Sequence, residues 1–388
     1  MYNPAIWTGS NVLSTDEMNT LYSSEGMGYS ILRLMIYADE NRWADDVAGA
    51  KQAQDLGAIV FACPWEAPAE LTDEVDGTPH VKPENYAAYA DHLISYINYM
   101  KDNGVDIYAI SVQNEPDMDF TAWTPSEVVN FLKQEGARIR ATGAKLMAPE
   151  ACGTQPEYTD PVLADAEAFA QTDIVAGHLY QGFIEEDGGY AQNRHDYVCG
   201  LYPRLGGKTW WMTEHLFNDG GNETDPAQWV FRNWDYNFTH LATEIHKCME
   251  GYCSAYVYWY LKRFYGLIGD NDQRSPVAEG EVSKNGYIMA HYAKYATGMT
   301  RVAVTSSKES CWATAYVNED GTELTLVLLN ADVTPKTVEI QLPGIRTATA
   351  VETSETQNMQ PVDVSVSDDR LTLPISVQGI VSVRIALD

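Results

Sequence analysis

Short apolar runs alternate with longer amphipathic stretches over the first three quarters of the chain. The apolar runs predict strands at Ser30–Ile36, Ala58–Cys63, Tyr108–Gln113, Lys145–Ala148, Ile174–His178, Thr209–Met212 and Ala255–Trp259. Most of the intervening stretches have apolar residues at three- and four-residue spacing, which predicts helices. Repeated strand–helix units favour parallel pairing of the strands.

Several of the predicted helices have recognisable ends. Ala44–Leu56 ends at Gly57, a residue suited to the left-handed conformation that closes a helix. Thr124-Pro125-Ser126-Glu127 is a capping box with proline at the first helical position, and it predicts a helix to about Thr142. Further helices are predicted at Glu84–Asn103, Leu163–Gln171, Tyr197–Leu205 and Gln228–Met249.

Seven strands between residues 30 and 259, with one closing strand before residue 30, make eight. This number favours an α/β fold of the (β/α)₈ TIM barrel type over an open doubly wound sheet. After about Thr300 no helix signal remains, and β-rich runs follow at Cys311–Val317, Glu323–Leu329, Thr337–Gln341, Leu371–Pro374 and Ile380–Ile385. We therefore predict a barrel over residues 1–300 and a fused antiparallel β-sandwich over residues 301–388.

Composition and charge narrow the classes of partner. Among 388 residues, 45% are hydrophobic and 21% are charged, which is typical of a globular protein. The chain has 55 acidic and 25 basic residues, and a net charge of −30 repels nucleic acid and anionic membranes. No apolar run reaches the roughly 20 residues that a membrane span needs.

Two further features of the sequence concern metals and targeting. Six cysteines are scattered without a CxxC pair, so we expect buried free thiols, with at most one disulfide, and no metal site. Met1-Tyr2-Asn3-Pro4 has no basic region followed by an apolar one, so no signal peptide is expected within these residues.

Carboxylates follow the ends of several predicted strands. In an α/β barrel the active site lies at the carboxyl ends of the strands, where Glu66, Glu115, Glu150 and Glu214 are found. Glu115 follows the fourth barrel strand and Glu214 the seventh, so the two can face each other across the barrel mouth. Glycoside hydrolysis needs such a pair, one as acid and the other as nucleophile or base.

Other strand-end residues suit a sugar. The Asn114 amide can bond a sugar 2-hydroxyl, and aromatic rings that pyranoses can stack on come from Trp65, Tyr180, Trp259 and Tyr260. Two alternatives remain open at this point. The acids could be ordinary surface residues, or the aromatic groove could belong to a carbohydrate-binding protein without catalysis.

Two motifs carry a resemblance to a known family. Ser111–Pro116 (SVQNEP) and Trp211–Glu214 (WMTE) resemble the acid/base and nucleophile motifs of glycoside hydrolase family 30. Similarity to its bacterial xylanase branch, subfamily 8, extends over nearly the whole chain, through Ser30–Arg33, Phe61–Trp65, His178–Tyr180, Ala255–Tyr260 and Gly286–His291.

The resemblance implies a retaining enzyme with a barrel and a fused β domain, acting without a cofactor. It implies Glu115 as acid/base and Glu214 as nucleophile. The reacting sugar's subsite would be shaped by Arg33, Asn114, Trp65, Tyr180 and Trp259. Retention implies carboxyl groups about 5–5.5 Å apart. We also expect the nearby Glu214 anion to raise the pKa of Glu115.

Arg263 matches the position of the arginine that holds a glucuronate side chain in glucuronoxylanases of this subfamily. Three departures from the family pattern matter. The chain begins later than the family's first strands, Leu216 and Phe217 replace an aromatic pair after the nucleophile motif, and Gly269–Val282 looks longer than usual. The last two flank the glucuronate position, so we predict no strict dependence on glucuronate.

The sequence therefore predicts a secreted endo-β-1,4-xylanase acting on xylan or glucuronoxylan. A glucuronate-dependent glucuronoxylanase is one alternative. Another is a family 30 enzyme acting on a β-1,6-glucan or β-1,6-galactan.

Overall fold

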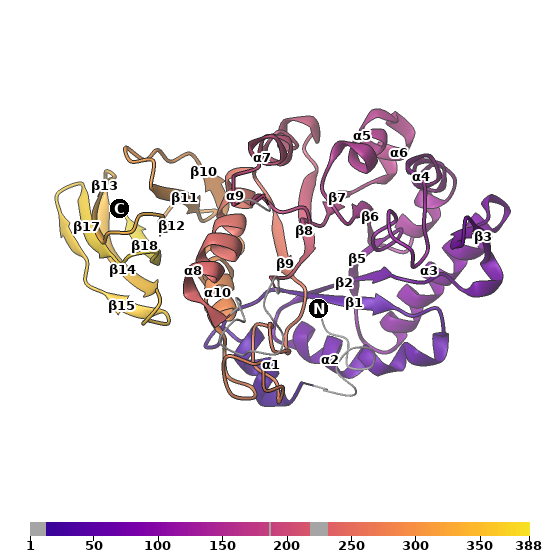
Figure 1. The fold of residues 1–388 in the computed structure, drawn as a ribbon, viewed down its shortest axis with the longest axis horizontal. Coiled ribbons are helices and arrows are strands. Elements are labelled where there is room, and N and C mark those ends of the chain that lie inside the picture. Colours follow the sequence, from indigo (N-terminus) through magenta and orange to yellow (C-terminus); the bar gives the residue numbers. More distant parts are fainter. Residues whose placement is uncertain (1–12, 186–187, 218–231) are drawn as a thin grey trace. The chain divides into compact units, whose positions relative to one another are not determined.

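A computed structural model describes residues 13–185, 188–217 and 232–388 (Figure 1). The chain divides into two compact units. The first comprises Met1–Tyr22, Ser30–Leu216 and Gly251–Leu261; the second comprises Ser23–Tyr29, Phe217–Glu250 and Lys262–Asp388. These units are not divided at a single point of the chain, and the boundary near residue 300 stays a prediction.

The first unit is built around a seven-stranded parallel sheet in the order β1-β2-β5-β6-β7-β8-β9. Its strands are β1 Ile31–Ile36, β2 Ile59–Pro64, β5 Ile107–Ser111, β6 Lys145–Ala151, β7 Ile174–Gly177, β8 Thr209–His215 and β9 Ala255–Tyr258. All seven strands predicted between residues 30 and 259 are confirmed. Each pairs with the next strand of the sheet along the chain, as repeated strand–helix units require.

The eighth, closing strand is not found where the structure can test it. Residues 13–29 contain the helix α1 (Thr15–Tyr22), and residues 1–12, where the rest of this prediction falls, lie outside the described residues. A short antiparallel hairpin, β3 (Thr72–Val75) and β4 (Thr78–Val81), follows β2. It was not predicted because its strands are mostly charged and polar.

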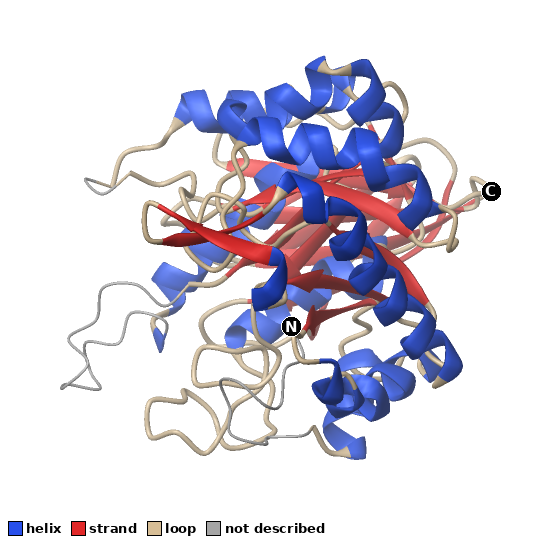
Figure 2. Ribbon diagram, turned by 90° about the vertical axis from the view of Figure 1, so that its right-hand side faces the viewer, coloured by secondary structure: helices blue, strands red, loops and turns tan. Residues whose placement is uncertain are grey.

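Helices flank the parallel sheet (Figure 2). They are α2 Ala44–Asp55, α3 Tyr86–Asp102, α4 Pro125–Arg140, α5 Pro156–Ala164, α6 Ala166–Gln171 and α7 Gln192–Cys199, with 3₁₀ turns at Glu40–Arg42, Ala69–Leu71, Pro83–Asn85 and Tyr202–Arg204. The capping box of α4 is confirmed in both directions. The helix predicted at Leu163–Gln171 is instead the end of α5 and a new helix, α6, capped by Asp165.

The inner side of the sheet is filled with apolar side chains from neighbouring strands. One buried cluster draws on β2 and β5 to β9: Phe61, Ala109, Met147, Ile174, Ala176, Trp211, Ala255 and Val257. A filled interior of this kind is typical of an α/β barrel, in which chemistry is left to the loops at the strand ends.

The second unit contains helices and two antiparallel sheets. Its helical segments are α8 Trp234–Asn237, a π-helical turn Phe238–Ala242, α9 Thr243–Glu250 and α10 Lys284–Ala296. The strands are β10 Thr300–Val302, β11 Cys311–Val317, β12 Glu323–Asn330, β13 Lys336–Gln341, β14 Ile345–Thr353, β15 Gln360–Val362, β16 Ser365–Ser367, β17 Arg370–Ile375 and β18 Ile380–Leu387. Part of the helix predicted at Gln228–Met249, residues 228–231, lies outside the described residues.

The antiparallel sheets form the predicted sandwich. A six-stranded sheet runs β10-β11-β12-β18-β14-β15 and a three-stranded sheet runs β13-β17-β16. Their facing side chains make one core, with Leu326 and Val383 from the larger sheet and Leu373 from the smaller. Among the described helices, none is long and apolar enough to cross a bilayer.

Helix α10 is joined to the larger sheet by a buried histidine. His291 Nδ1 lies 2.8 Å from Ser382 Oγ, and Nε2 lies 2.9 Å from Thr353 Oγ1. Burial lowers the pKa of His291 to about 3, so the ring is neutral and bonds through one donor and one acceptor nitrogen. The helix and the sheet therefore form one packed body within the second unit.

Candidate active site

The two candidate carboxylates leave the carboxyl ends of β5 and β8. The backbone of Glu115 is fixed by its N–H, which donates to Glu150 O at the end of β6 (2.9 Å). Glu115 and Glu150 have φ of 46° and 60°, in the left-handed region that side chains with a Cβ seldom adopt. Such a conformation costs about 1–2 kcal/mol and is found mainly where the surrounding structure enforces it, often at functional sites.

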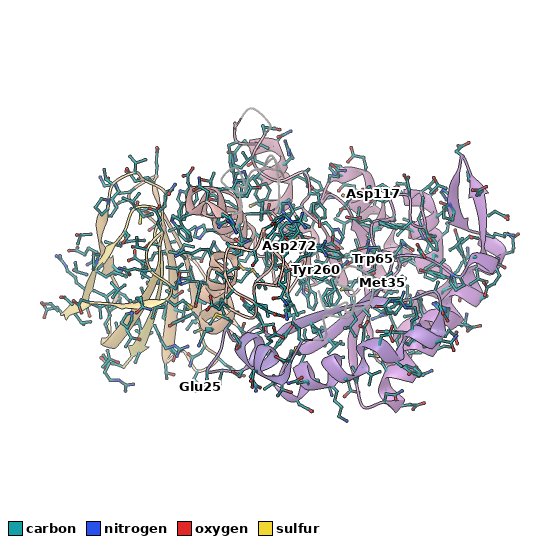
Figure 3. The ribbon with its side chains drawn as sticks, turned by 60° about the horizontal axis from the view of Figure 1, so that its bottom comes forward. Glu25, Met35, Trp65, Asp117, Tyr260 and Asp272 are labelled. Carbon is teal, nitrogen blue, oxygen red and sulfur yellow. The ribbon has the colours of Figure 1, made fainter. Side chains whose placement is uncertain are left out.

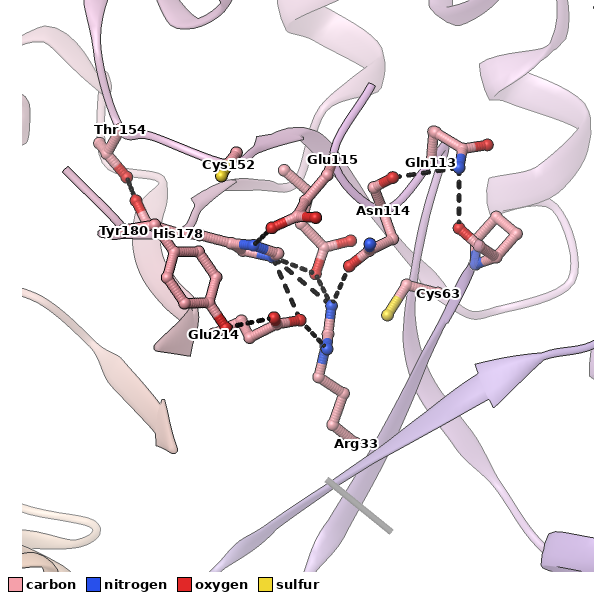
Figure 4. A network of polar contacts seen from close by, with 12 residues as sticks. Arg33, Cys63, Gln113, Asn114, Glu115, Cys152, Thr154, His178, Tyr180 and Glu214 are labelled. Atoms are coloured by element: carbon pink, nitrogen blue, oxygen red, sulfur yellow. Dashed lines mark hydrogen bonds and ion pairs between the residues drawn. The ribbon is translucent and has the colours of Figure 1, made fainter. Parts of the chain in front are cut away.

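Glu115 and Glu214 are brought together, as the strand-end rule predicts. An oxygen of one carboxylate lies within 4.8 Å of an oxygen of the other, and a ring nitrogen of His178 lies within the same distance of both. Both residues are buried. Figure 4 shows the two carboxylates on either side of the His178 ring, with Arg33 reaching in between the neighbouring strands.

Each oxygen of Glu214 accepts a hydrogen bond. Arg33 Nη1 donates to Oε2 (2.5 Å), and the Tyr180 hydroxyl donates to Oε1 (2.7 Å). Burial alone would lower the pKa of Arg33, but the negative charges of Glu214 and Glu150 outweigh it and raise this pKa. Two donors, one of them permanently charged, thus fix the orientation of the Glu214 carboxylate.

Arg33 also holds the neighbouring groups. Its Nη2 donates to Asn114 Oδ1 (2.6 Å) and to Glu150 Oε1 (3.1 Å). Burial raises the pKa of Glu150, but the charges of Arg33 and His178 outweigh it, so this pKa lies below its ordinary value. Glu150 therefore balances the buried guanidinium from the side away from Glu214.

Asn114 presents a free donor to the site. Its oxygen is occupied by Arg33, while its buried Nδ2 donates to no described residue. A buried amide without a partner is rare and costs about 1–3 kcal/mol. A ligand oxygen in the site would satisfy this donor, as expected for a residue that bonds a sugar hydroxyl.

His178 lies between the carboxylates and is charged. Its Nδ1 lies 3.0 Å from Glu115 Oε1, and its Nε2 lies 3.7 Å from Glu150 Oε1 and 3.8 Å from Glu214 Oε2. Burial lowers the pKa of His178, but the Glu214 charge, the hydrogen bond to Glu115 and the nearby Glu150 carboxylate outweigh it and raise this pKa to about 9.

The predicted rise in the pKa of Glu115 is wrong. Burial does raise it, but the hydrogen bond and charge of His178, with smaller contributions from Cys152 and Arg33, outweigh burial and lower the pKa. The prediction took account of the Glu214 anion and omitted the imidazolium between the two acids.

Three of the predicted aromatic residues line the same region. The Arg33 guanidinium carbon lies 4.6 Å from the centroid of the Trp65 ring. The Trp65 and Trp259 rings are 5.8 Å apart at an interplanar angle of 45°, and Tyr260 meets Trp259 edge-on at 5.2 Å. Figure 3 labels Trp65 and Tyr260. Trp65, Trp259 and Tyr260 are largely buried in the described structure.

Arg263 belongs to the second unit. Its backbone N–H donates to Ile268 O (3.3 Å), and its guanidinium carbon lies 5.6 Å from the ring centroids of Phe264 and Tyr265. Its role toward a glucuronate stays a prediction.

Sequence reasoning missed two members of the cluster. Glu150 was noted only as a strand-end acid, and His178 only as part of the His178–Tyr180 segment that resembles the family. Glu115, His178 and Glu214 could group around a metal ion, but Arg33 already neutralises the Glu214 carboxylate that such an ion would need. Position at a strand end was the available signal for both missed residues.

Comparisons with known proteins identify the family of this chain. Residues 14–199 match the model of the glycosyl hydrolase family 30 TIM-barrel domain, which confirms the barrel. The chain is 32% identical over 394 residues to glucuronoxylanase XynC of Bacillus subtilis, covering 98% of this chain and 86% of that protein.

Two solved structures are also similar to this chain. A family 30 endoxylanase from Clostridium papyrosolvens C71 has a TM-score of 0.80 and 30% identity, covering 97% of this chain and 93% of that one. A family 30 subfamily 8 xylanase from Clostridium acetobutylicum has a TM-score of 0.77 and 31% identity, covering 96% and 93%. With this much identity over nearly its whole length, the chain belongs to glycoside hydrolase family 30.

Proposed function

We propose that the protein is an endo-β-1,4-xylanase that cleaves xylan with retention, with Glu214 as nucleophile and Glu115 as acid/base. The observation that carries the proposal is the short separation of the two acids, with oxygens within 4.8 Å. Retaining enzymes hold their carboxyl groups about 5–5.5 Å apart, whereas inverting enzymes need about 6.5–9.5 Å to admit a water. The Arg33 and Tyr180 donors hold the Glu214 carboxylate in one orientation, as a nucleophile requires.

The first step needs a proton on Glu115. The His178–Glu115 pair shares one across the 3.0 Å contact. Imidazolium with carboxylate, and imidazole with carboxylic acid, are two forms of the same pair and differ only in where that proton lies. As the glycosidic C–O bond breaks, Glu115 gives the proton to the leaving oxygen, while a Glu214 oxygen bonds the anomeric carbon.

The second step reverses these roles. Glu115, now a carboxylate, takes a proton from water as the water oxygen attacks the anomeric carbon and the bond to Glu214 breaks. Asn114 Nδ2, buried and without a described acceptor, would donate to the 2-hydroxyl of the reacting xylose. No cofactor enters either step, since both use side-chain carboxylates.

Xylan is proposed because the similar proteins that carry the family assignment are named xylanases and glucuronoxylanases. We propose that both plain and glucuronate-decorated xylan are cut, and that Arg263→Ala has a small effect. The residues after Glu214 are His215, Leu216 and Phe217, and neither Leu216 nor Phe217 can donate a hydrogen bond to a carboxylate. Secretion is part of the proposal, because a polymer of this size does not enter cells.

The deciding experiment compares glucuronoxylan with linear xylooligosaccharides, with the products followed by proton NMR from the first turnover. We expect cleavage of both, with the β-anomer appearing first. First appearance of the α-anomer would contradict retention. Cleavage of the decorated polymer alone, with a large loss in Arg263→Ala, would favour glucuronate dependence. Xylan binding without cleavage would favour a non-catalytic carbohydrate-binding protein.

A further inference from the structure

The loop that follows Glu115 is closed on itself. The N–H of Met118 donates to Glu115 O (2.9 Å), and the N–H of Trp123 donates to Pro116 O (2.8 Å). Trp123 is buried against the α3 and α4 helices, where it stacks on Tyr86 at 5.5 Å. The loop therefore leaves the site, turns and returns to the core within a few residues of Glu115.

Neighbouring strand-end loops hold this loop from two further sides. An oxygen of Asp117 accepts the N–H of Cys152 (2.9 Å), and the Thr121 hydroxyl oxygen accepts the N–H of Ala67 (2.9 Å). Thr121 is buried. Figure 3 labels Asp117, the first residue after the Glu115-Pro116 turn. A loop tied at both ends and on two sides has little freedom left to lose when a ligand binds.

The tip of this fixed loop is apolar and exposed. Met118 and Phe120 keep 41% and 39% of their surface open, with Asp119, also exposed, between them. The residues just before and just after this tip, Asp117 and Thr121, are held by their hydrogen bonds to Cys152 and Ala67. An exposed Phe and Met on a fixed loop provide an apolar surface on which the face of a sugar ring can pack.

The role of Glu115 in the first step indicates which part of the substrate lies beside this loop. Glu115 protonates the oxygen that departs, so the leaving half of the polymer lies beside Glu115 and continues away from Glu214. Met118 is bonded to the backbone of Glu115 itself. We propose that Met118 and Phe120 form a platform for the xylose units on the leaving side of the cleaved bond, an assignment that rests on the proposed function.

The platform makes a distinct kinetic prediction. It contacts only the leaving half of the substrate. Its loss should therefore lower kcat/KM more for a substrate with a long leaving group than for one with a small leaving group. For Phe120→Ala we expect the ratio of kcat/KM for xylohexaose to that for β-xylobiosyl fluoride, whose leaving group is a single atom, to fall about five- to ten-fold. Met118→Ala should lower the ratio about two- to three-fold.

A second measurement follows the covalent intermediate. Xylobiose added as an acceptor binds the leaving side and competes with water, so Phe120→Ala should lower the fraction of transfer product by a similar factor. The matched control is Tyr202→Ala, which removes an aromatic ring of 48% exposure from the turn that precedes β8, at the opposite ends of the strands. This variant should change neither the ratio of the two kcat/KM values nor the fraction of transfer product.

Three outcomes would overturn the proposal. An unchanged ratio in Phe120→Ala and in the double variant with Met118→Ala would show that the tip does not bind the leaving half. An equal fall in Tyr202→Ala would show an unspecific effect. Wild-type protein that hydrolyses neither substrate would refute the proposed function, and with it the assignment of xylose to the platform, whereas a failure confined to the ratio leaves the function standing.

Discussion

Replacing His178 tests whether its positive charge stabilises the cluster of acids that includes the catalytic candidates Glu115 and Glu214. The ring is buried among Glu115, Glu150 and Glu214, and its pKa rises from 6.5 to about 9. That difference corresponds to about 3 kcal/mol of preference for the charged ring in the folded state. Because the pKa is raised on folding, this stabilisation is complete below about pH 6.5 and is lost as the pH rises through about 9.

The assay is urea unfolding of wild-type protein and His178→Asn at pH 6, 7.5 and 9.5. The difference in unfolding free energy between the two cancels the other titrating groups, and it should shrink by about 3 kcal/mol between pH 6 and 9.5. In kcat/KM, the alkaline limb near pH 9 should move to lower pH in the variant, because Glu115 would then hold its proton alone. A free-energy difference that stays constant over this range would refute a charged His178.

Three further predictions concern the nucleophile and the second unit. Glu214→Gln should reduce turnover by several orders of magnitude while the circular dichroism spectrum stays that of wild type, since the amide keeps the shape and loses the nucleophile; residual activity within ten-fold would assign the nucleophile elsewhere. Leu373→Ala, in the core of the sandwich and 1% exposed, should cost about 2–5 kcal/mol in urea unfolding, and a cost below about 1 kcal/mol would mean that the core is loosely packed. A chain of residues 1–300 should be insoluble, because it leaves His291 and the buried face of α10 without Ser382 and the sheet they pack on; a soluble, active product would contradict this.

Strands with a continuous or alternating apolar pattern were predictable, and a strand without either pattern was not. β1 to β9 of the parallel sheet have continuous apolar runs such as Ile59–Pro64, because both faces meet other atoms. The nine-residue strand β14, Ile345–Thr353, was missed. Its first half is largely exposed and carries Arg and Thr, so it lacks the apolar signal, and its position is set by pairing with β18.

The candidate site also had one part that the sequence predicted and one part that it did not. Position at a strand end and the neighbouring sequence were enough to identify Glu115, Asn114 and Glu214. The contacts of His178 with three acids were not predictable, because they join side chains from the ends of four strands that lie far apart in the sequence. The predicted direction of the Glu115 pKa shift was wrong because the contact with His178 was not predicted.

On the proposed function, the unsatisfied Asn114 amide also limits where a decorated polymer can be cut. Its Nδ2 is enclosed, and a donor in that position fits a bare hydroxyl at carbon 2 of the reacting sugar. An acetyl or uronosyl group on that oxygen would need the space that the amide fills. With Asn114 in this proposed role, we expect cleavage only where the backbone unit bears no substituent at this oxygen. The spacing of branches along a natural hemicellulose, rather than the number of sugar-binding subsites in the enzyme, would then set the sizes of the fragments released.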